Sequence, residues 1–94
     1  SKSIFGGNIT EERSFAIHLK NEKESAISME VIDQIPVSAN PDIVVKVIDL
    51  NGGELQQANG KVSWTVRLEP GSSMVLPFSY SVRYPKNTFI NLPR

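Results

Sequence analysis

Apolar residues at every second position are the feature that most restricts what this chain can fold into. In residues 72–84, apolar or aromatic side chains occupy every even position from 74 on: Met74, Leu76, Phe78, Tyr80, Val82 and Tyr84. Successive side chains of a β-strand point to opposite faces, whereas an amphipathic helix repeats about every 3.6 residues. The pattern therefore predicts a strand with one buried face. No stretch of ten residues shows helical periodicity, so we expect essentially no helix.

Three further segments, 13–20, 25–33 and 61–68, show the same alternation and predict half-buried strands. Their apolar faces consist of Phe15, Ile17 and Leu19, of Ile27, Met29 and Val31, and of Val62, Trp64, Val66 and Leu68. Residues 42–50 differ because they are almost continuously apolar. We expect this strand to be covered on much of both faces.

The segments between the strands predict how the chain turns. Four polar residues, 21–24, separate the first two alternating strands and favour an antiparallel hairpin between them. Two prolines in residues 34–41 interrupt any ladder, which predicts a crossover between sheets.

Glycine and proline mark the later turns. The pair Asn59-Gly60 favours a type I′ hairpin turn, and Glu69-Pro70-Gly71 predicts a tight turn with proline at its second position. Pro77 interrupts the last strand, so we expect a bulge, an edge position or a bend there.

Strands at this spacing predict an all-β fold, namely an antiparallel immunoglobulin/fibronectin-III-like β-sandwich of about seven strands. The 94 residues suffice for one small domain. We expect that domain to span residues 11–94, with residues 1–10 forming a linker or a short first strand from a preceding domain. Thr88–Leu92 is expected to be a last short strand or an ordered tail.

Composition removes several classes of function. Ten basic and ten acidic residues cancel, so no long-range field attracts nucleic acid or an anionic membrane. Cysteine is absent, which excludes disulfide frameworks, thiolate zinc sites and cysteine nucleophiles. No apolar run approaches the ~20 residues that span a bilayer. We expect no nucleic-acid partner and no direct membrane insertion.

His18 is the only histidine and lies in mid-strand on the polar face. Catalysis there would need a nucleophile such as Ser79 or Ser81 and an orienting carboxylate. The sequence offers no strand–turn–helix elbow to expose such a serine. We interpret His18 as a surface or cross-strand residue, and we expect that the chain is not an enzyme and has no catalytic residues.

Carboxylates are the other candidates for chemistry, and they include Glu30, Asp33, Asp42, Asp49 and Glu54. A glycosidase pair needs a walled cleft that desolvates one acid, and a core this small leaves no spare wall. We interpret these residues as surface acids. A cation between Asp33 and Asp42 is the weaker alternative, because neither a zinc ligand set nor a calcium loop is present. We expect no metal and no cofactor.

The aromatic residues allow two interpretations. Trp64, Phe78, Tyr80 and Tyr84 alternate with polar residues, as a core strand requires, and we assign them to the core. As the alternative, an exposed Trp64 or tyrosine would form a carbohydrate-stacking platform, with hydrogen bonds from residues 56–59. Tyr84, last before Pro85, is the aromatic residue best placed to be partly exposed.

Several segments in order resemble one bacterial family. They are Asp33-Gln34-Ile35-Pro36-Val37-Ser38, Gly52-Gly53-Glu54-Leu55, Gly60-Lys61-Val62-Ser63-Trp64, Leu68-Glu69-Pro70-Gly71 and the run from Phe78 to Lys86. Together they are similar to the C-terminal domain of the mucoidy-inhibitor-A-like proteins, a domain of unknown function, over residues 11–92. The resemblance implies a larger envelope protein with this β domain last, and hence a periplasmic or extracellular location. It implies no catalytic or ligand-binding residues.

Our first functional hypothesis is a non-catalytic accessory or interaction module of a bacterial cell-envelope protein. Its expected partners are other domains of the same parent protein, or another protein that pairs with an exposed edge strand. The alternative hypothesis is a carbohydrate-binding module of a surface polysaccharide system.

Overall fold

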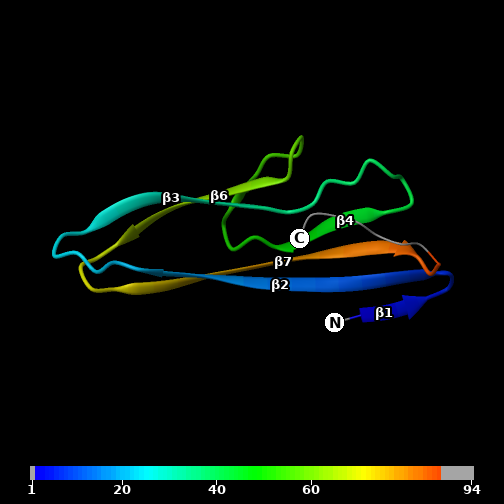
Figure 1. The fold of residues 1–94 in the computed structure, drawn as a ribbon, viewed down its shortest axis with the longest axis horizontal. Coiled ribbons are helices and arrows are strands. Elements are labelled where there is room, and N and C mark those ends of the chain that lie inside the picture. Colours follow the sequence, from blue (N-terminus) through cyan, green and yellow to red (C-terminus); the bar gives the residue numbers. More distant parts are fainter. Residues whose placement is uncertain (1, 88–94) are drawn as a thin grey trace.

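The computed structural model describes residues 2–87, which form seven strands in two antiparallel sheets and no helix (Figure 1). The strands are β1 (Lys2–Phe5), β2 (Asn8–Lys20), β3 (Ile27–Gln34), β4 (Val44–Asp49), β5 (Glu54–Leu55), β6 (Lys61–Leu68) and β7 (Ser73–Pro85). One sheet has the order β1-β2-β7-β4 and the other β3-β6-β5. The all-β, sandwich-like architecture predicted from the alternation is confirmed. The expected tail, Thr88–Leu92, lies outside the described residues.

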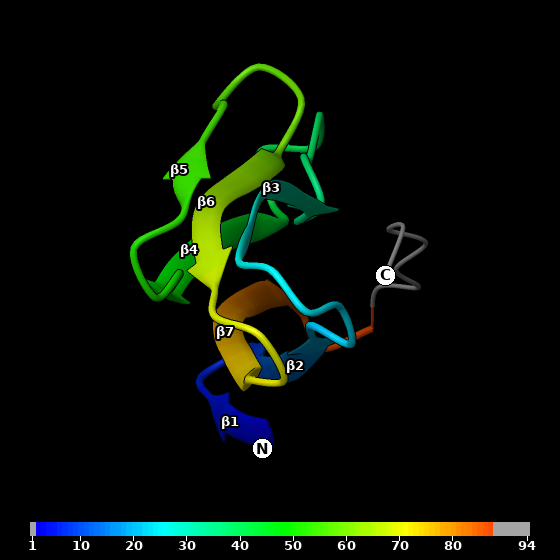
Figure 2. The ribbon, with the colours of Figure 1, turned by 90° about the vertical axis from the view of Figure 1, so that its left-hand side faces the viewer.

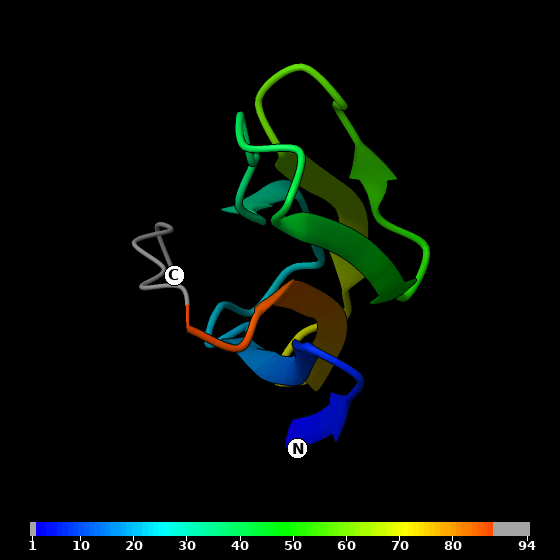
Figure 3. The ribbon, with the colours of Figure 1, turned by 90° about the vertical axis from the view of Figure 1, so that its right-hand side faces the viewer.

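The pair of β2 and β7 is the longest element of the fold. The two strands pair over thirteen residues each, from Asn8 opposite Pro85 to Lys20 opposite Ser73. This pair runs along the molecule, whose extents are 54 × 26 × 19 Å (Figure 1). Viewed along the long axis, β4 lies between β7 and the strands β5 and β6 (Figures 2 and 3). The first sheet thus curls toward the second at β4.

The hairpin expected between the first two alternating strands is wrong. β2 pairs with β1 and β7, whereas β3 pairs with β6, so residues 21–26 carry the chain from one sheet to the other. The buried Asn21 amide explains this path, because it donates hydrogen bonds to the carbonyls of Leu68 and Glu69 at the opposite turn. The crossover predicted near residues 34–41 is confirmed, since the chain there returns from β3 to β4 in the first sheet.

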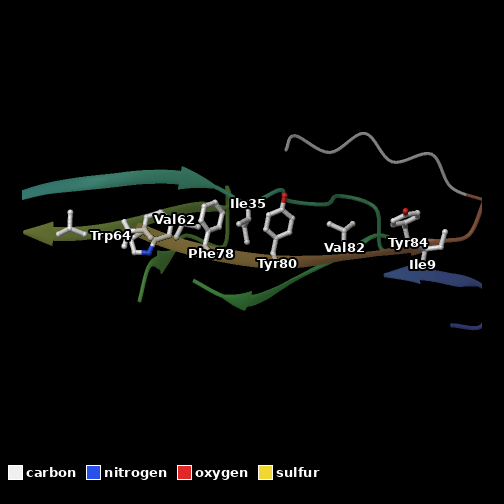
Figure 4. Packing of buried hydrophobic residues seen from close by; sticks show 10 residues of the cluster. Ile9, Ile35, Val62, Trp64, Phe78, Tyr80, Val82 and Tyr84 are labelled. Carbon is white, nitrogen blue, oxygen red and sulfur yellow. The ribbon is translucent and has the colours of Figure 1, made fainter. Parts of the chain in front are cut away.

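The predicted core faces are confirmed. All four apolar residues of β6 are buried, and so are the five even-numbered residues of β7 from Leu76 to Tyr84. Figure 4 shows Phe78, Tyr80, Val82 and Tyr84 in a row along β7, with Trp64 beside Phe78 and Ile9 beside Tyr84. The rings of Phe15 and Phe78 stack with their centroids 5.3 Å apart, and the ring centroids of Trp64 and Phe78 are 5.5 Å apart. The core is therefore a single elongated layer.

The type I′ turn is not where the sequence indicated. Both Asn51 (φ 50°) and Gly52 (φ 80°) have positive φ, and the Gly53 N–H donates to the Leu50 carbonyl, as a type I′ turn requires. Asn59 lacks a positive φ, so residues 57–60 instead form a four-residue loop that ends with Gly60. The tight turn at Pro70-Gly71 is confirmed, with Gly71 at φ 72°.

Candidate functional site

The polar residues considered for catalysis do not converge. His18 is exposed opposite Val75, whereas Ser79 lies opposite Ser14, four positions along β7. Four positions along a strand span about 13 Å, so His18 and Ser79 lie too far apart to act together. Glu30, Asp42, Asp49 and Glu54 are exposed, and Asp33 is half-buried. Within residues 2–87 no three histidine or acidic side chains cluster as metal ligands would.

The aromatic residues form the core. Trp64, Phe78, Tyr80 and Tyr84 are all buried, and the Trp64 indole N–H donates to the Leu50 carbonyl at 2.7 Å. The expectation that Tyr84 is partly exposed is wrong, because only 6% of it is accessible. Its hydroxyl donates to a Glu11 carboxylate oxygen at 2.5 Å, and this hydrogen bond, with burial, raises the pKa of Tyr84. A carbohydrate platform would need such a ring at the surface.

The feature that stands out is the free edge of β4. β4 pairs with β7 on one side only and ends its sheet, so within residues 2–87 no strand pairs with its other side. Its exposed apolar residues are Val44 at 37%, Val47 at 43% and Ile48 at 48%. The expectation that residues 42–50 are covered on both faces is therefore wrong. An apolar strand with one unpaired side is able to pair with another chain.

The register shows which backbone groups of β4 face this free edge. Two hydrogen bonds extend the β2–β7 ladder beyond its ends, from Asn21 N–H to the Ser72 carbonyl and from Lys86 N–H to the Gly7 carbonyl. Both bonds involve an even-numbered residue, Ser72 or Lys86. Because every second residue of an antiparallel strand hydrogen-bonds to the same neighbouring strand, the even residues of β7 bond to β2 and the odd ones face β4.

Val44 and Lys46 lie opposite the odd residues Arg83 and Ser81, so they bond to β7. Val45 and Val47 therefore direct their N–H and C=O groups to the free edge. The same alternation explains the position of Pro77, an odd residue of β7. The N–H that proline lacks would point away from β2, and no β4 residue pairs with β7 there, because the last partner of β4 is Ser79. Pro77 is thus tolerated at an edge position, one of the expected outcomes.

A bulge in β4 sets the direction of its side chains. Val47 lies opposite Tyr80 and Asp49 opposite Ser79, so Ile48 is the extra residue. Val45 and Val47 share the inner face with the buried residues Val82 and Tyr80. Lys46 and Asp49 consequently lie together on the outer face, although their separation of three residues would otherwise place them on opposite faces.

A groove of about 690 Å³ lies along β4. Residues 35–41 of the crossover form one wall, and Leu55, Gln57 and Gly60 of the β5–β6 hairpin form another. The walls are joined, because the Ile35 N–H donates to the Gly60 carbonyl at 2.9 Å. Gly60 has φ 75°, and a Cβ there would collide with the Ile35 carbonyl oxygen, so this approach requires glycine.

The sequence of β4 gave little sign of this site, because a continuously apolar run is typical of a strand buried on both faces. The available signal was Lys46, a charged residue in the middle of an apolar strand, since lysine is common on edge strands. Asn21 was also missed, because a polar residue in a polar segment gives no sign of burial. Its hydrogen bonds became visible only when the turn at residues 69–72 was placed beside it.

Comparisons with known proteins identify a family and no function. No described residue belongs to a helix long and apolar enough to cross a membrane. No curated protein and no solved structure matches the chain. A family model described as a domain of unknown function, DUF4139, matches residues 1–86. The chain therefore belongs to the DUF4139 family.

Proposed function

We propose that this domain is a non-catalytic interaction module that binds an extended polypeptide segment from outside the domain along β4. The observation that carries this proposal is an unpaired, apolar edge strand at the floor of a walled groove. An added strand would hydrogen-bond to the N–H and C=O groups of Val45 and Val47. Its inward side chains would enter the groove. Strand addition of this kind obtains affinity from the main chain and specificity from alternate side chains.

The setting we propose is a bacterial cell-envelope protein of which this domain is one part. It rests on the resemblance of the segments within residues 33–86 to the C-terminal domain of mucoidy-inhibitor-A-like proteins. The bound segment would then come from another domain of the parent protein or from a second envelope protein, in the periplasm or outside the cell. A carbohydrate-binding function has less support, because the aromatic rings it requires lie in the core.

Peptide display tests this proposal even though the natural partner is unidentified. Random nonapeptides are selected on the immobilised domain, and individual peptides are then measured against two proline variants. Val47→Pro removes an N–H from the free edge beside the groove. Val75→Pro is the matched control, because Val75 is half-exposed on β7 and its N–H also faces away from β2, beyond the end of β4.

We expect selected peptides to alternate apolar and polar residues and to bind Val47→Pro at least about tenfold more weakly than the wild type, since one main-chain hydrogen bond and its geometry are lost. Val75→Pro should bind like the wild type. Failure to enrich any peptide, or equal binding to Val47→Pro, would contradict the proposal. Circular dichroism of both variants establishes that they remain folded.

A further inference from the structure

We infer that the segment bound at β4 carries an acidic side chain opposite Lys46 and apolar side chains toward the groove. This inference rests on the proposed function and specifies the chemistry of its partner. It follows from the two faces that β4 presents to an added strand. The inner face is apolar, whereas the outer face of the first half of β4 is cationic.

The cationic character comes from Lys46 and Arg83. Lys46 lies opposite Ser81, and Arg83 is two residues further along β7, so both side chains lie on the outer face of the sheet at this edge. Both are exposed, and neither forms an ion pair within residues 2–87. Among the residues of the paired strands, the acids on that face are Glu12, which lies opposite Ser81 on β2, and Asp49, which follows the bulge in β4. A strand added beside β4 would lie next to Lys46 on the side away from both β7 and Glu12.

The groove supplies the apolar half of the pattern. Its lining includes the inner-face residues Val45 and Val47, the crossover residues Ile35 and Val37, and Leu55. Among the lining residues that belong to the described part of the chain, Lys46 is the only charged one, so none of them is an acid that would favour a basic partner. Directly opposite side chains of paired strands share a face, and opposite charges in that position attract. The complementary segment is therefore one in which apolar residues alternate with polar ones, one of them aspartate or glutamate.

Two other occupants are less compatible with this chemistry. Residues 88–94 of this chain contain no acid to place opposite Lys46. A second copy would have to pair through its own β4, which is enclosed by the walls of its own groove. The bulge at Ile48 also limits regular pairing between two such edges. The segment is thus expected to come from outside this domain.

Two fluorescent peptides of alternating sequence, one with valine and glutamate and one with valine and lysine, test the inference by anisotropy. The wild type should bind the glutamate peptide about fivefold more tightly than the lysine peptide. Lys46→Glu should reverse the preference, and high salt should reduce it. Lys23→Glu is the matched control, because it makes the same change in net charge at an exposed position in the turn between β2 and β3.

Equal binding of both peptides, or an unchanged preference in Lys46→Glu, would overturn the inference and leave the proposed function standing. Binding of neither peptide to the wild type would contradict both. Sedimentation as a dimer that dissociates in Val47→Pro would identify a second copy as the occupant. Tighter peptide binding after deletion of residues 88–94 would identify that segment as the occupant. Either result would also overturn the inference.

Discussion

Asn21 is the one buried polar side chain among the described residues, and it joins the two turns at one end of the sandwich. Its amide donates to the carbonyls of Ser25, Leu68 and Glu69 at 2.9, 3.0 and 3.2 Å, and its oxygen accepts from the Lys23 N–H at 2.9 Å. The side chain thus satisfies backbone groups of both sheet connections, among them the buried Leu68 carbonyl.

Replacing Asn21 with alanine should lower the free energy of unfolding by about 2–3 kcal/mol, because the buried Leu68 carbonyl and two partly buried carbonyls lose their donor. Chemical denaturation followed by tryptophan fluorescence measures this change. Asn40→Ala is the control, since Asn40 is exposed and bonds only to its neighbours, and it should cost less than about 1 kcal/mol. Equal effects of the two substitutions would show that the Asn21 hydrogen bonds do not hold the turns together.

The Tyr84 hydroxyl, through its hydrogen bond to Glu11, makes stability depend on alkaline pH. Its hydrogen bond to Glu11 raises its pKa in the folded state, so the folded chain holds that proton more strongly than the unfolded chain. The contribution of this group to the free energy of unfolding is fully present at pH values below the pKa of the unfolded state, about 10. It decreases as the pH rises through the pKa of the folded state. Above pH ~10 the wild type should therefore lose stability more steeply than Tyr84→Phe. Parallel decreases in denaturation series at several pH values would exclude this contribution.

At the level of elements, the strands were more predictable than their pairing. The alternation in residues 61–68 and 72–84 correctly located β6 and β7 and their buried faces, because burial follows the period of the strand. Which strands pair is a long-range property, and the hairpin assigned to β2 and β3 was wrong for that reason. The apolar run of β4 correctly indicated a strand but gave no sign that one side remains open, so the groove became visible only with the crossover placed above it.

The turn between β4 and β5 packs tightly against β6. A Cβ on Gly53 would lie 2.7 Å from the Val62 Cγ1 and 2.8 Å from the Trp64 indole. Gly53→Ala should therefore destabilise the fold by about 1–3 kcal/mol through overpacking and should shift the tryptophan emission. Gly7→Ala is the control, because Gly7 has no positive φ and a Cβ there meets no atom within 4 Å. An unchanged melting temperature and emission in Gly53→Ala would contradict the tight packing.

The whole molecule is more extended than its length requires. The Cα radius of gyration is 16.4 Å, whereas a compact domain of this size has about 12 Å. The accessible surface is 6302 Å², against about 5,400 Å² for a typical protein of this mass. The long β2–β7 pair accounts for this shape, because the shorter strands β3 and β6 cover only part of it. An extended core of one layer leaves the outer strands with few tertiary contacts.

Hydrogen exchange should reveal this arrangement as a gradient of local stability. The amides of Phe78 and Tyr80 bond to β2 within the middle of the sheet, so they should exchange only through global unfolding. The Lys46 amide bonds to β7 from an edge strand with exposed neighbours, and it should exchange more than about tenfold faster through local opening. A peptide bound in the groove should slow exchange at Val45 and Val47, whose amides face the free edge, and also at Lys46. If Lys46 exchanged as slowly as Phe78 in the free domain, β4 would open only with the entire fold, and a strand that joins it would meet a rigid edge already formed.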